Sequence, residues 1–188
     1  KSGYLTSSEH FVIKVASGGY PIKNNTGNLQ VYSQTTGRLE ALLLDEGILT
    51  EHRTAAAGAV AARYLAPKTI GVVGMIGTGV QARYQLQYLK YVVDCRSCLL
   101  LLWGRTPEHV VSVQRELEQE GVWTNVKVAS SPQDLLEQCD LIVTTTTARE
   151  PILMQGKKRK KPQHITCIGA DAPGKMELDP AIVAESDL

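Results

Sequence analysis

The chain has 188 residues, and 20 Lys and Arg balance 19 Asp and Glu to give a net charge of +1. This charge gives no general reason to expect nucleic acid or an acidic membrane as a partner, and no apolar run reaches the roughly 18 residues of a membrane helix. Four irregularly spaced cysteines are too few for a disulfide framework, so a soluble protein of the reducing cytoplasm is predicted, with one full core and part of a second domain.

Residues 1–48 alternate strand-like runs with turns. Strands are expected at 10–16, 29–33 and 39–44, separated by turns at 18–21, 24–27 and 35–37. This order is typical of an antiparallel β-meander. Because the first strand begins abruptly, the meander is expected to be the remainder of a larger sheet.

A connecting helix is expected over residues 49–67. Thr50 is a suitable N-cap, the alanine-rich segment 51–65 has a high helix propensity, and Pro67 ends it. Its small side chains let another backbone approach closely. The helix would join the meander to a second domain at 68–188.

Residues 69–84 read TIGVVGMIGTGVQARY, an apolar strand followed by a glycine turn and the start of a helix. The pattern G-x-G-x-x-A is formed by Gly77, Thr78, Gly79, Val80, Gln81 and Ala82. Its first glycine permits a tight turn, the second lets the backbone approach a pyrophosphate, and the small third residue allows close helix–strand packing. The pattern therefore predicts a dinucleotide site at the helix N-terminus, and the alternative is a structural turn without a ligand.

Further strands are expected at 99–103, 126–128, 141–144 and 164–168, with helices at 106–119 and 132–139. Repeated strand–helix units predict an α/β fold, a Rossmann-type doubly wound parallel sheet with helices on both faces. Ligands bind at the carboxyl ends of such strands. The turns at 77–79, 104–106, 144–147 and 169–172 should therefore share one rim.

Two other motifs carry no predicted chemistry. The run KKRKK at 157–161 follows a helix-like segment at 150–155 and is expected to be a solvated loop, with a targeting or nucleic-acid patch as the alternative. Cys95 and Cys98 form a C-x-x-C without a second pair, so no metal site is expected there.

The residues after the second parallel strand bear on cofactor choice. NAD-specific sites usually place a carboxylate there, roughly 20 residues beyond the glycine turn, whereas this chain has Gly104, Arg105 and Thr106. A guanidinium beside a hydroxyl suits a 2′-phosphate. NADP(H) is therefore expected, with NAD(H) possible, and the alternative is that Arg105 only lies at a helix start. Candidates for further cofactor contacts on the same rim are Thr144, Thr145 and Thr146.

Asp171 follows the fifth strand, where it would face the nicotinamide end of a bound cofactor. Pro173 and Gly174 would form a turn that fixes it. Such a carboxylate can take and return a proton during hydride transfer at a C–N bond. The alternative is an Asx-turn.

Lys14 and Arg53 are candidates for binding a substrate carboxylate. Alternation places Lys14 on the strand face opposite its apolar neighbours, and Arg53 is expected in the first turn of its helix, where a cation is unfavourable unless an anion is near. For each residue the alternative is a solvated side chain.

Three motifs in this order resemble the ornithine cyclodeaminase/mu-crystallin family: LTEHRTAA at 49–56, GTGVQA at 77–82 and IGADAPGKMEL at 168–178. The resemblance extends over about residues 11–179. It implies a Rossmann domain, a substrate and dimerisation domain of which residues 1–48 form a part, and a homodimer. It also implies that the chain is a fragment of a longer subunit.

By position, the resemblance implies that Lys14 and Arg53 bind the carboxylate of a small amino or imino acid and that Asp171 is the catalytic acid/base. Members are cyclodeaminases that convert ornithine to proline and ammonia with recycled NAD, NAD(P)-dependent amino-acid dehydrogenases, and ketimine reductases using NADPH. Arg105 and Thr106 are similar to the mu-crystallin-like branch, which favours imine reduction or amino-acid dehydrogenation over ornithine cyclisation. A non-enzymatic, crystallin-like protein that binds NADPH is the alternative from another class.

Overall fold

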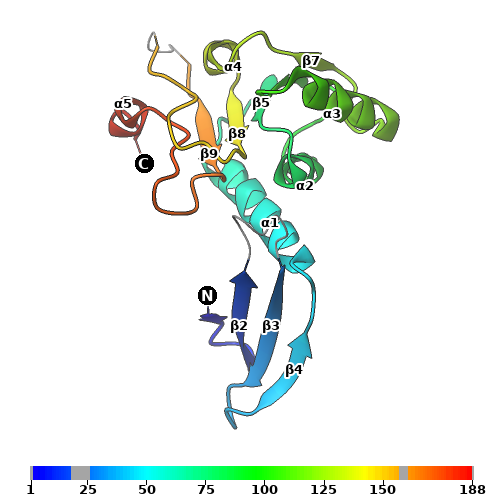
Figure 1. Cartoon of the computed structure of the whole chain (residues 1–188), viewed down its shortest axis with the longest axis vertical. Helices are drawn as coiled ribbons and strands as arrows, with labels where there is room; N and C mark the ends of the chain where they lie inside the picture. Colours follow the sequence, from blue (N-terminus) through cyan, green and yellow to red (C-terminus); the bar gives the residue numbers. More distant parts are fainter. Residues whose placement is uncertain (1, 18–25, 157–160, 188) are drawn as a thin grey trace. The chain divides into compact units, whose positions relative to one another are not determined.

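The computed structural model describes residues 2–17, 26–156 and 161–187. By its contacts the chain forms two compact units, Lys1–Arg53 and Thr54–Leu188, and helix α1 (Ile48–Leu65) contributes to both. Figure 1 labels the elements in chain order. None of the helices in the described part of the chain combines the length and apolar character needed to cross a bilayer.

The first unit is a four-stranded antiparallel sheet in the order β1-β2-β3-β4. Its strands are β1 (Ser2–Tyr4), β2 (His10–Ser17), β3 (Thr26–Ser33) and β4 (Leu39–Leu43). Phe11 and Tyr32 lie opposite each other on β2 and β3, and their rings stack with centroids 4.9 Å apart. The predicted meander is thus present, with a first strand that the sequence pattern did not indicate.

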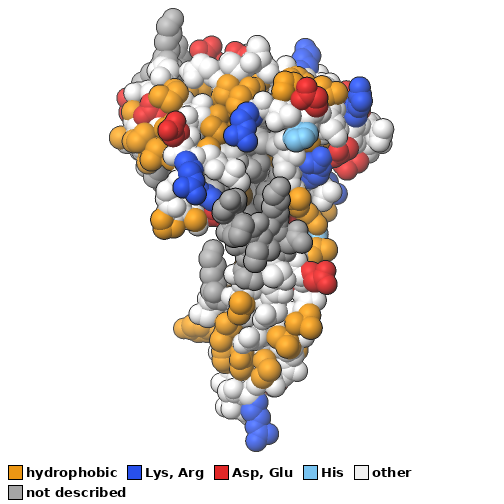
Figure 2. All heavy atoms as spheres, viewed as in Figure 1, with side chains coloured by type: hydrophobic (Ala, Val, Ile, Leu, Met, Phe, Trp, Pro, Cys, Tyr) orange, Lys and Arg blue, Asp and Glu red, His pale blue; other side chains and the backbone are white. Residues whose placement is uncertain are grey.

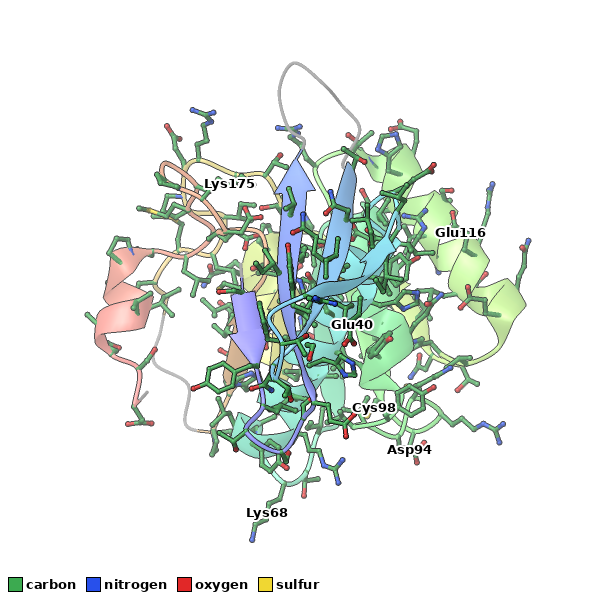
Figure 3. All side chains as sticks on the ribbon, turned by 90° about the horizontal axis from the view of Figure 1, so that it is seen from below. Glu40, Lys68, Asp94, Cys98, Glu116 and Lys175 are labelled. Atoms are coloured by element: carbon green, nitrogen blue, oxygen red, sulfur yellow. The ribbon has the colours of Figure 1, made fainter. Side chains whose placement is uncertain are left out.

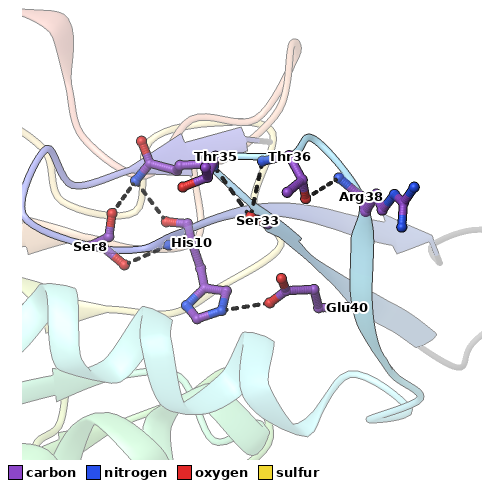
Figure 4. A network of polar contacts seen from close by, with 8 residues as sticks. Ser8, His10, Ser33, Thr35, Thr36, Arg38 and Glu40 are labelled. Carbon is purple, nitrogen blue, oxygen red and sulfur yellow. Dashed lines mark hydrogen bonds and ion pairs between the residues drawn. The ribbon is translucent and has the colours of Figure 1, made fainter.

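Polar contacts close the turn between β3 and β4 (Figure 4). The buried Ser33 hydroxyl accepts hydrogen bonds from the backbone N–H groups of Thr35 and Thr36. Across β3, His10 Nε2 of β2 lies 2.7 Å from Glu40 Oε2 of β4. The turn predicted at 35–37 is confirmed, whereas the turn predicted at 18–21 lies outside the described residues.

The second unit contains a five-stranded parallel sheet in the order β7-β6-β5-β8-β9. Its strands are β5 (Val72–Ile76), β6 (Leu99–Trp103), β7 (Val126–Val128), β8 (Leu141–Thr144) and β9 (His164–Cys167). The bounds of β6, β7 and β8 are those predicted. Because the chain runs outward from β5 first to one side and then to the other, β5 and β8 flank the switch point at which such sheets bind ligands.

Helices cover both faces of this sheet, as a doubly wound fold requires. They are α1, α2 (Val80–Leu89), α3 (Pro107–Glu120), α4 (Pro132–Gln138) and α5 (Pro180–Ala184). On one face, Met75 and Leu102 join a core with Leu86 of α2 and Val113 of α3. On the other face, Ile142 packs with Leu135 of α4 and with Leu153. The predicted α/β fold is confirmed.

Some local predictions are wrong. Thr50 lies inside α1 and is not its N-cap, and Gly27, expected in a turn, lies in β3. Helix α1 begins at Ile48, so Arg53 is its sixth residue and lies in the second turn, where the N-terminal dipole acts more weakly than in the first. Residues 150–155 form no helix, because the N–H groups of Ile152 and Leu153 donate to the Glu177 carbonyl and Leu153 pairs with Leu178 in an isolated bridge. The charge run that follows lies, except for Lys161, outside the described residues.

Candidate functional site

The glycine turn follows the carboxyl end of β5, the central strand. Gly77 has a φ of +115°, and a Cβ atom there would lie 2.5 Å from Thr145 Oγ1, so this position requires glycine. The N–H of Gly77 donates to the Trp103 carbonyl at the end of β6 over 2.9 Å. Gly79 differs, since a Cβ atom there would meet nothing within 4 Å. The backbone at Gly79 therefore faces open space, as close approach of a ligand requires.

The helix that follows the turn is open at its N-terminus. Gly79 is the N-cap of α2 and supplies no side-chain acceptor, and Thr106 caps α3 without a side-chain hydrogen bond. Helices α4 and α5 differ, because the side chains of Ser131 and Asp179 accept from their first-turn N–H groups. The first turns of α2 and α3 thus keep N–H donors for an outside acceptor, and a phosphate anion fits such a position.

Arg105 lies exposed between β6 and α3. Within the ranges that the structure describes, its side chain makes no hydrogen bond or ion pair. Next to it, a Cβ atom on Gly104 would lie 2.8 Å from Thr78 Cγ2, so the loop carrying Arg105 packs directly on the glycine turn. The guanidinium and the open N-terminus of α2 consequently belong to one rim.

The three threonines at the carboxyl end of β8 use their hydroxyl protons within the protein. Thr145 Oγ1 donates to the Ile76 carbonyl over 3.2 Å, while Thr144 Oγ1 and Thr146 Oγ1 each donate to the Glu177 carboxylate over 2.7 Å. Thr144 is fully buried. These contacts hold the carboxyl end of β8 in place, and they leave only the hydroxyls of Thr145 and Thr146 for another molecule, as acceptors.

Glu177 is the residue of this site to which sequence reasoning assigned no role. It is 1% exposed, and its carboxylate also accepts the N–H groups of Thr146 over 2.7 Å and of Gly169 over 2.8 Å. Four hydrogen bonds therefore join the ends of β8 and β9 through one buried anion. The sequence did contain a signal, because an acidic side chain stands between the apolar Met176 and Leu178.

Asp171 lies in the loop between β9 and α5. Its carboxylate is 67% exposed, and Oδ1 lies 2.6 Å from Lys175 Nζ; Figure 3 labels Lys175. The N–H of Lys175 donates to the Ala172 carbonyl, which closes the predicted turn over Pro173 and Gly174. The carboxylate thus has a lysine partner, makes no Asx-turn hydrogen bond within the described part of the chain, and stays accessible from solvent.

The predicted site residues divide between the two units. Lys14 is half-buried on β2 and Arg53 is exposed on α1, and both belong to the unit Lys1–Arg53. The glycine turn, Arg105 and Asp171 belong to the unit Thr54–Leu188. Within the second unit, the four turns predicted to share a rim are joined by the contacts described above.

Comparison with known proteins identifies related sequences over the whole chain. The profile of the ornithine cyclodeaminase/mu-crystallin family matches residues 13–188. The chain is 35% identical to the uncharacterized cyclodeaminase y4tK of Sinorhizobium fredii, covering 100% of this chain and 57% of that protein. It is 30% identical to the ketimine reductase mu-crystallin of Rattus norvegicus, covering 89% of this chain and 50% of that protein. The chain thus spans about half the length of these relatives.

Solved structures agree with the sequence relatives. The iminosuccinate reductase of Paracoccus denitrificans in complex with NAD⁺ superposes with a TM-score of 0.85 at 30% identity, covering 100% of this chain and 57% of that one. An archaeal alanine dehydrogenase dimer with bound NAD gives a TM-score of 0.80 at 30% identity, covering 95% and 55%. By both sequence and fold, the chain belongs to the ornithine cyclodeaminase/mu-crystallin family.

Proposed function

We propose that the protein is a cytoplasmic NAD(P)H-dependent oxidoreductase that acts on the C–N bond of a small amino or imino acid. The observation that carries this proposal is the rim at which a glycine turn, an open helix N-terminus and the Asp171 loop meet. The names of the relatives support it, since a ketimine reductase and an iminosuccinate reductase both act on carbon–nitrogen double bonds. The first turn of α2 would hold the pyrophosphate of the cofactor.

NADP(H) is the cofactor that we propose, with NAD(H) as the alternative. Arg105 makes no ion pair with another described residue, and the Thr106 hydroxyl makes no capping bond, so both are available for a 2′-phosphate. The solved relatives hold NAD, which keeps the alternative open. The cofactor, when bound, supplies or accepts the hydride.

Asp171 would act as the acid/base that takes or returns the proton that accompanies hydride transfer. Lys175 Nζ, 2.6 Å away, holds the carboxylate in one orientation while leaving it accessible, as a group that exchanges protons with a substrate nitrogen must be. Lys14 and Arg53 would bind the substrate carboxylate, Arg53 through its two-pronged guanidinium. Holding the substrate by its carboxylate fixes the carbon that exchanges hydride, and orientation of this kind supplies much of the rate.

Turnover of a cyclic imine tests this function. The full-length protein is incubated with NADPH or NADH and pyrroline-2-carboxylate, and loss of nicotinamide absorbance is followed. Asp171→Asn should lower kcat by about 100-fold or more, while the Kd for the cofactor changes less than about twofold. Absence of turnover with any cyclic or linear imino acid would favour a protein that only binds the cofactor. A large loss of cofactor affinity in Asp171→Asn would instead indicate a structural turn.

Ornithine cyclodeamination is the second candidate, because a relative that aligns with the whole of this chain, over 57% of its own length, is named a cyclodeaminase. This reaction returns the hydride to the product, so it consumes no cofactor overall. Ornithine should then yield proline and ammonia with bound NAD and no net change in nicotinamide absorbance. The two candidates are therefore separated by one pair of assays on the same sample.

A homodimer is the assembly that we propose. Figure 2 shows apolar side chains gathered over the unit Lys1–Arg53, and its edge strand β4 exposes Leu39, Leu42 and Leu43. Exposed apolar side chains on an unpaired sheet edge are typical of a surface that pairs with another chain. The archaeal alanine dehydrogenase relative, which shares this fold, is a dimer.

A further inference from the structure

Arg83 of α2 connects the glycine turn to helix α3. Its Nη1 donates to the carbonyl oxygen of Thr78 over 2.7 Å and to that of Gly79 over 3.3 Å. Its Nε and Nη2 donate to the two carboxylate oxygens of Glu116 over 2.6 and 2.8 Å. One edge of the guanidinium therefore donates hydrogen bonds to the glycine turn and the other donates to α3. Helix α3 begins immediately after Arg105 and Thr106.

The carbonyls that Arg83 holds determine where the neighbouring N–H groups point. In a planar trans peptide, the C=O of one residue and the N–H of the next point in opposite directions. Anchoring the carbonyls of Thr78 and Gly79 therefore aims the N–H groups of Gly79 and Val80 to the opposite side. These N–H groups belong to the turn and the start of α2, where the G-x-G-x-x-A pattern presents donors to a pyrophosphate.

Glu116 fixes Arg83 in this role. Its Oε1 also accepts a hydrogen bond from Ser112 Oγ over 3.0 Å, so the carboxylate is held at both oxygens, and Figure 3 labels it on α3. The hydrogen bonds from Arg83 lower the pKa of Glu116 below its ordinary value, so the carboxylate remains ionised at neutral pH. A guanidinium engaged by a carboxylate in this bidentate way has little charge left to offer a phosphate.

We propose that Arg83, held by Glu116, is a positioning residue that presents the backbone N–H groups of the glycine turn to the pyrophosphate of the nicotinamide cofactor. The inference rests on the proposed function, because it requires a dinucleotide at this turn. It differs from a direct role, in which Arg83 would itself bind phosphate. The two roles predict opposite effects of Glu116→Gln on the Kd for the cofactor.

Cofactor binding to the full-length protein tests the inference. The Kd values for NADPH and NADH are measured by fluorescence titration of the reduced nicotinamide, which requires no turnover. Arg83→Met should raise both Kd values about tenfold, the effect of losing two hydrogen bonds that organise the turn. At saturating cofactor, kcat should stay within about twofold. The matched control is Arg115→Met, which removes an equal charge from an exposed position on α3.

Glu116→Gln separates positioning from direct binding. If Arg83 positions the turn, loss of its anionic partner loosens it and raises the Kd about threefold. If Arg83 binds phosphate itself, the same substitution releases the guanidinium and lowers the Kd, which would overturn the inference. An equal effect of Arg83→Met and Arg115→Met would overturn it as well. No binding of either nucleotide by the unmodified protein would remove the proposed function and this inference together.

Discussion

Two acidic residues six positions apart, Asp171 and Glu177, differ in burial, and the difference separates a structural role from a proposed chemical role. Glu177 is 1% exposed and its two oxygens accept four hydrogen bonds, so its carboxylate is satisfied by donors within the fold. Asp171 is 67% exposed and pairs with one lysine among the described residues, so its second oxygen is accessible to another molecule. The same functional group therefore serves as a clamp in one position and as a candidate proton carrier in the other.

Glu177→Gln tests the clamp. Each carboxylate oxygen accepts one backbone N–H, from Thr146 on one side and Gly169 on the other, and a backbone donor cannot reverse. An amide must therefore aim its NH₂ at one of these donors, which should lower the free energy of unfolding by about 2 kcal/mol. Chemical denaturation measures this loss. Glu150→Gln, the same change at an exposed position, should have no measurable effect, and equal stability of the two variants would contradict the clamp.

Arg105→Asp tests cofactor choice at the residue scale. A carboxylate at this position repels a 2′-phosphate and can accept hydrogen bonds from a ribose hydroxyl. The ratio of kcat/KM for NADPH to that for NADH should fall by about tenfold or more, which corresponds to one lost charge-assisted contact. Steady-state kinetics with both cofactors at one substrate concentration measure the ratio. An unchanged ratio would remove Arg105 from the cofactor site.

Sequence reasoning at the residue scale succeeded where the cause is local. The glycine requirement at Gly77 follows from a tight turn within a few residues. It missed the clamp because Glu177 is 33 positions from Thr144 and 31 from Thr146. Since the fold alone brings these side chains together, local spacing indicated three polar threonines at a rim but not the carboxylate to which two of their hydroxyls donate.

Among the secondary-structure elements, the helices differ in whether a side chain caps the N-terminus. The first turns of α2 and α3 have no side-chain cap, which leaves N–H donors for a ligand at the cost of helix stability. Helix α4 has only seven residues yet is closed by a capping box between Ser131 and Asp134. The first turn of α4 is thus closed by side chains of its own segment, while those of α2 and α3 remain open.

Ser131→Ala tests the cap of α4. Ser131 Oγ accepts the N–H of Asp134 over 3.2 Å, and the Asp134 carboxylate accepts the N–H of Ser131 over 3.0 Å. Removing the hydroxyl should lower the free energy of unfolding by about 1 kcal/mol, measured by denaturant titration. Cofactor affinity should not change. Ser131→Thr keeps the oxygen and should retain most of the stability, so equal losses in both variants would show that the cap contributes nothing.

Elements with a strong apolar pattern were predictable, and those made by tertiary pairing were not. Strands β6 and β8 have the predicted bounds because buried parallel strands read as continuous apolar runs. The segment 150–155 looked helical, but pairing with Glu177 and Leu178 fixes its backbone instead. Helix α5 was missed although Asp179 and Pro180 form a recognisable start, because five residues are too few to show a period.

At the scale of the whole molecule, the residues that we propose for cofactor chemistry and for substrate binding fall in different units. The second unit holds the glycine turn and Asp171, whereas Lys14 and Arg53 belong to the first. This division agrees with a subunit in which a dinucleotide domain supplies hydride chemistry and a separate sheet supplies substrate contacts. It also assigns the exposed apolar side chains of β4 to the unit that does not carry the dinucleotide rim.

Leu42→Glu tests the homodimer that we propose. Leu42 is 51% exposed on the edge strand β4, and a charge there would be buried without a partner if β4 forms the dimer interface. The dimer dissociation constant should rise at least about tenfold, measured by sedimentation of the full-length protein over a range of concentrations. Val111→Glu, at an exposed apolar position on α3, should leave the constant unchanged. A monomeric unmodified protein would refute the dimer, and an unaffected Leu42→Glu dimer would move its interface away from β4.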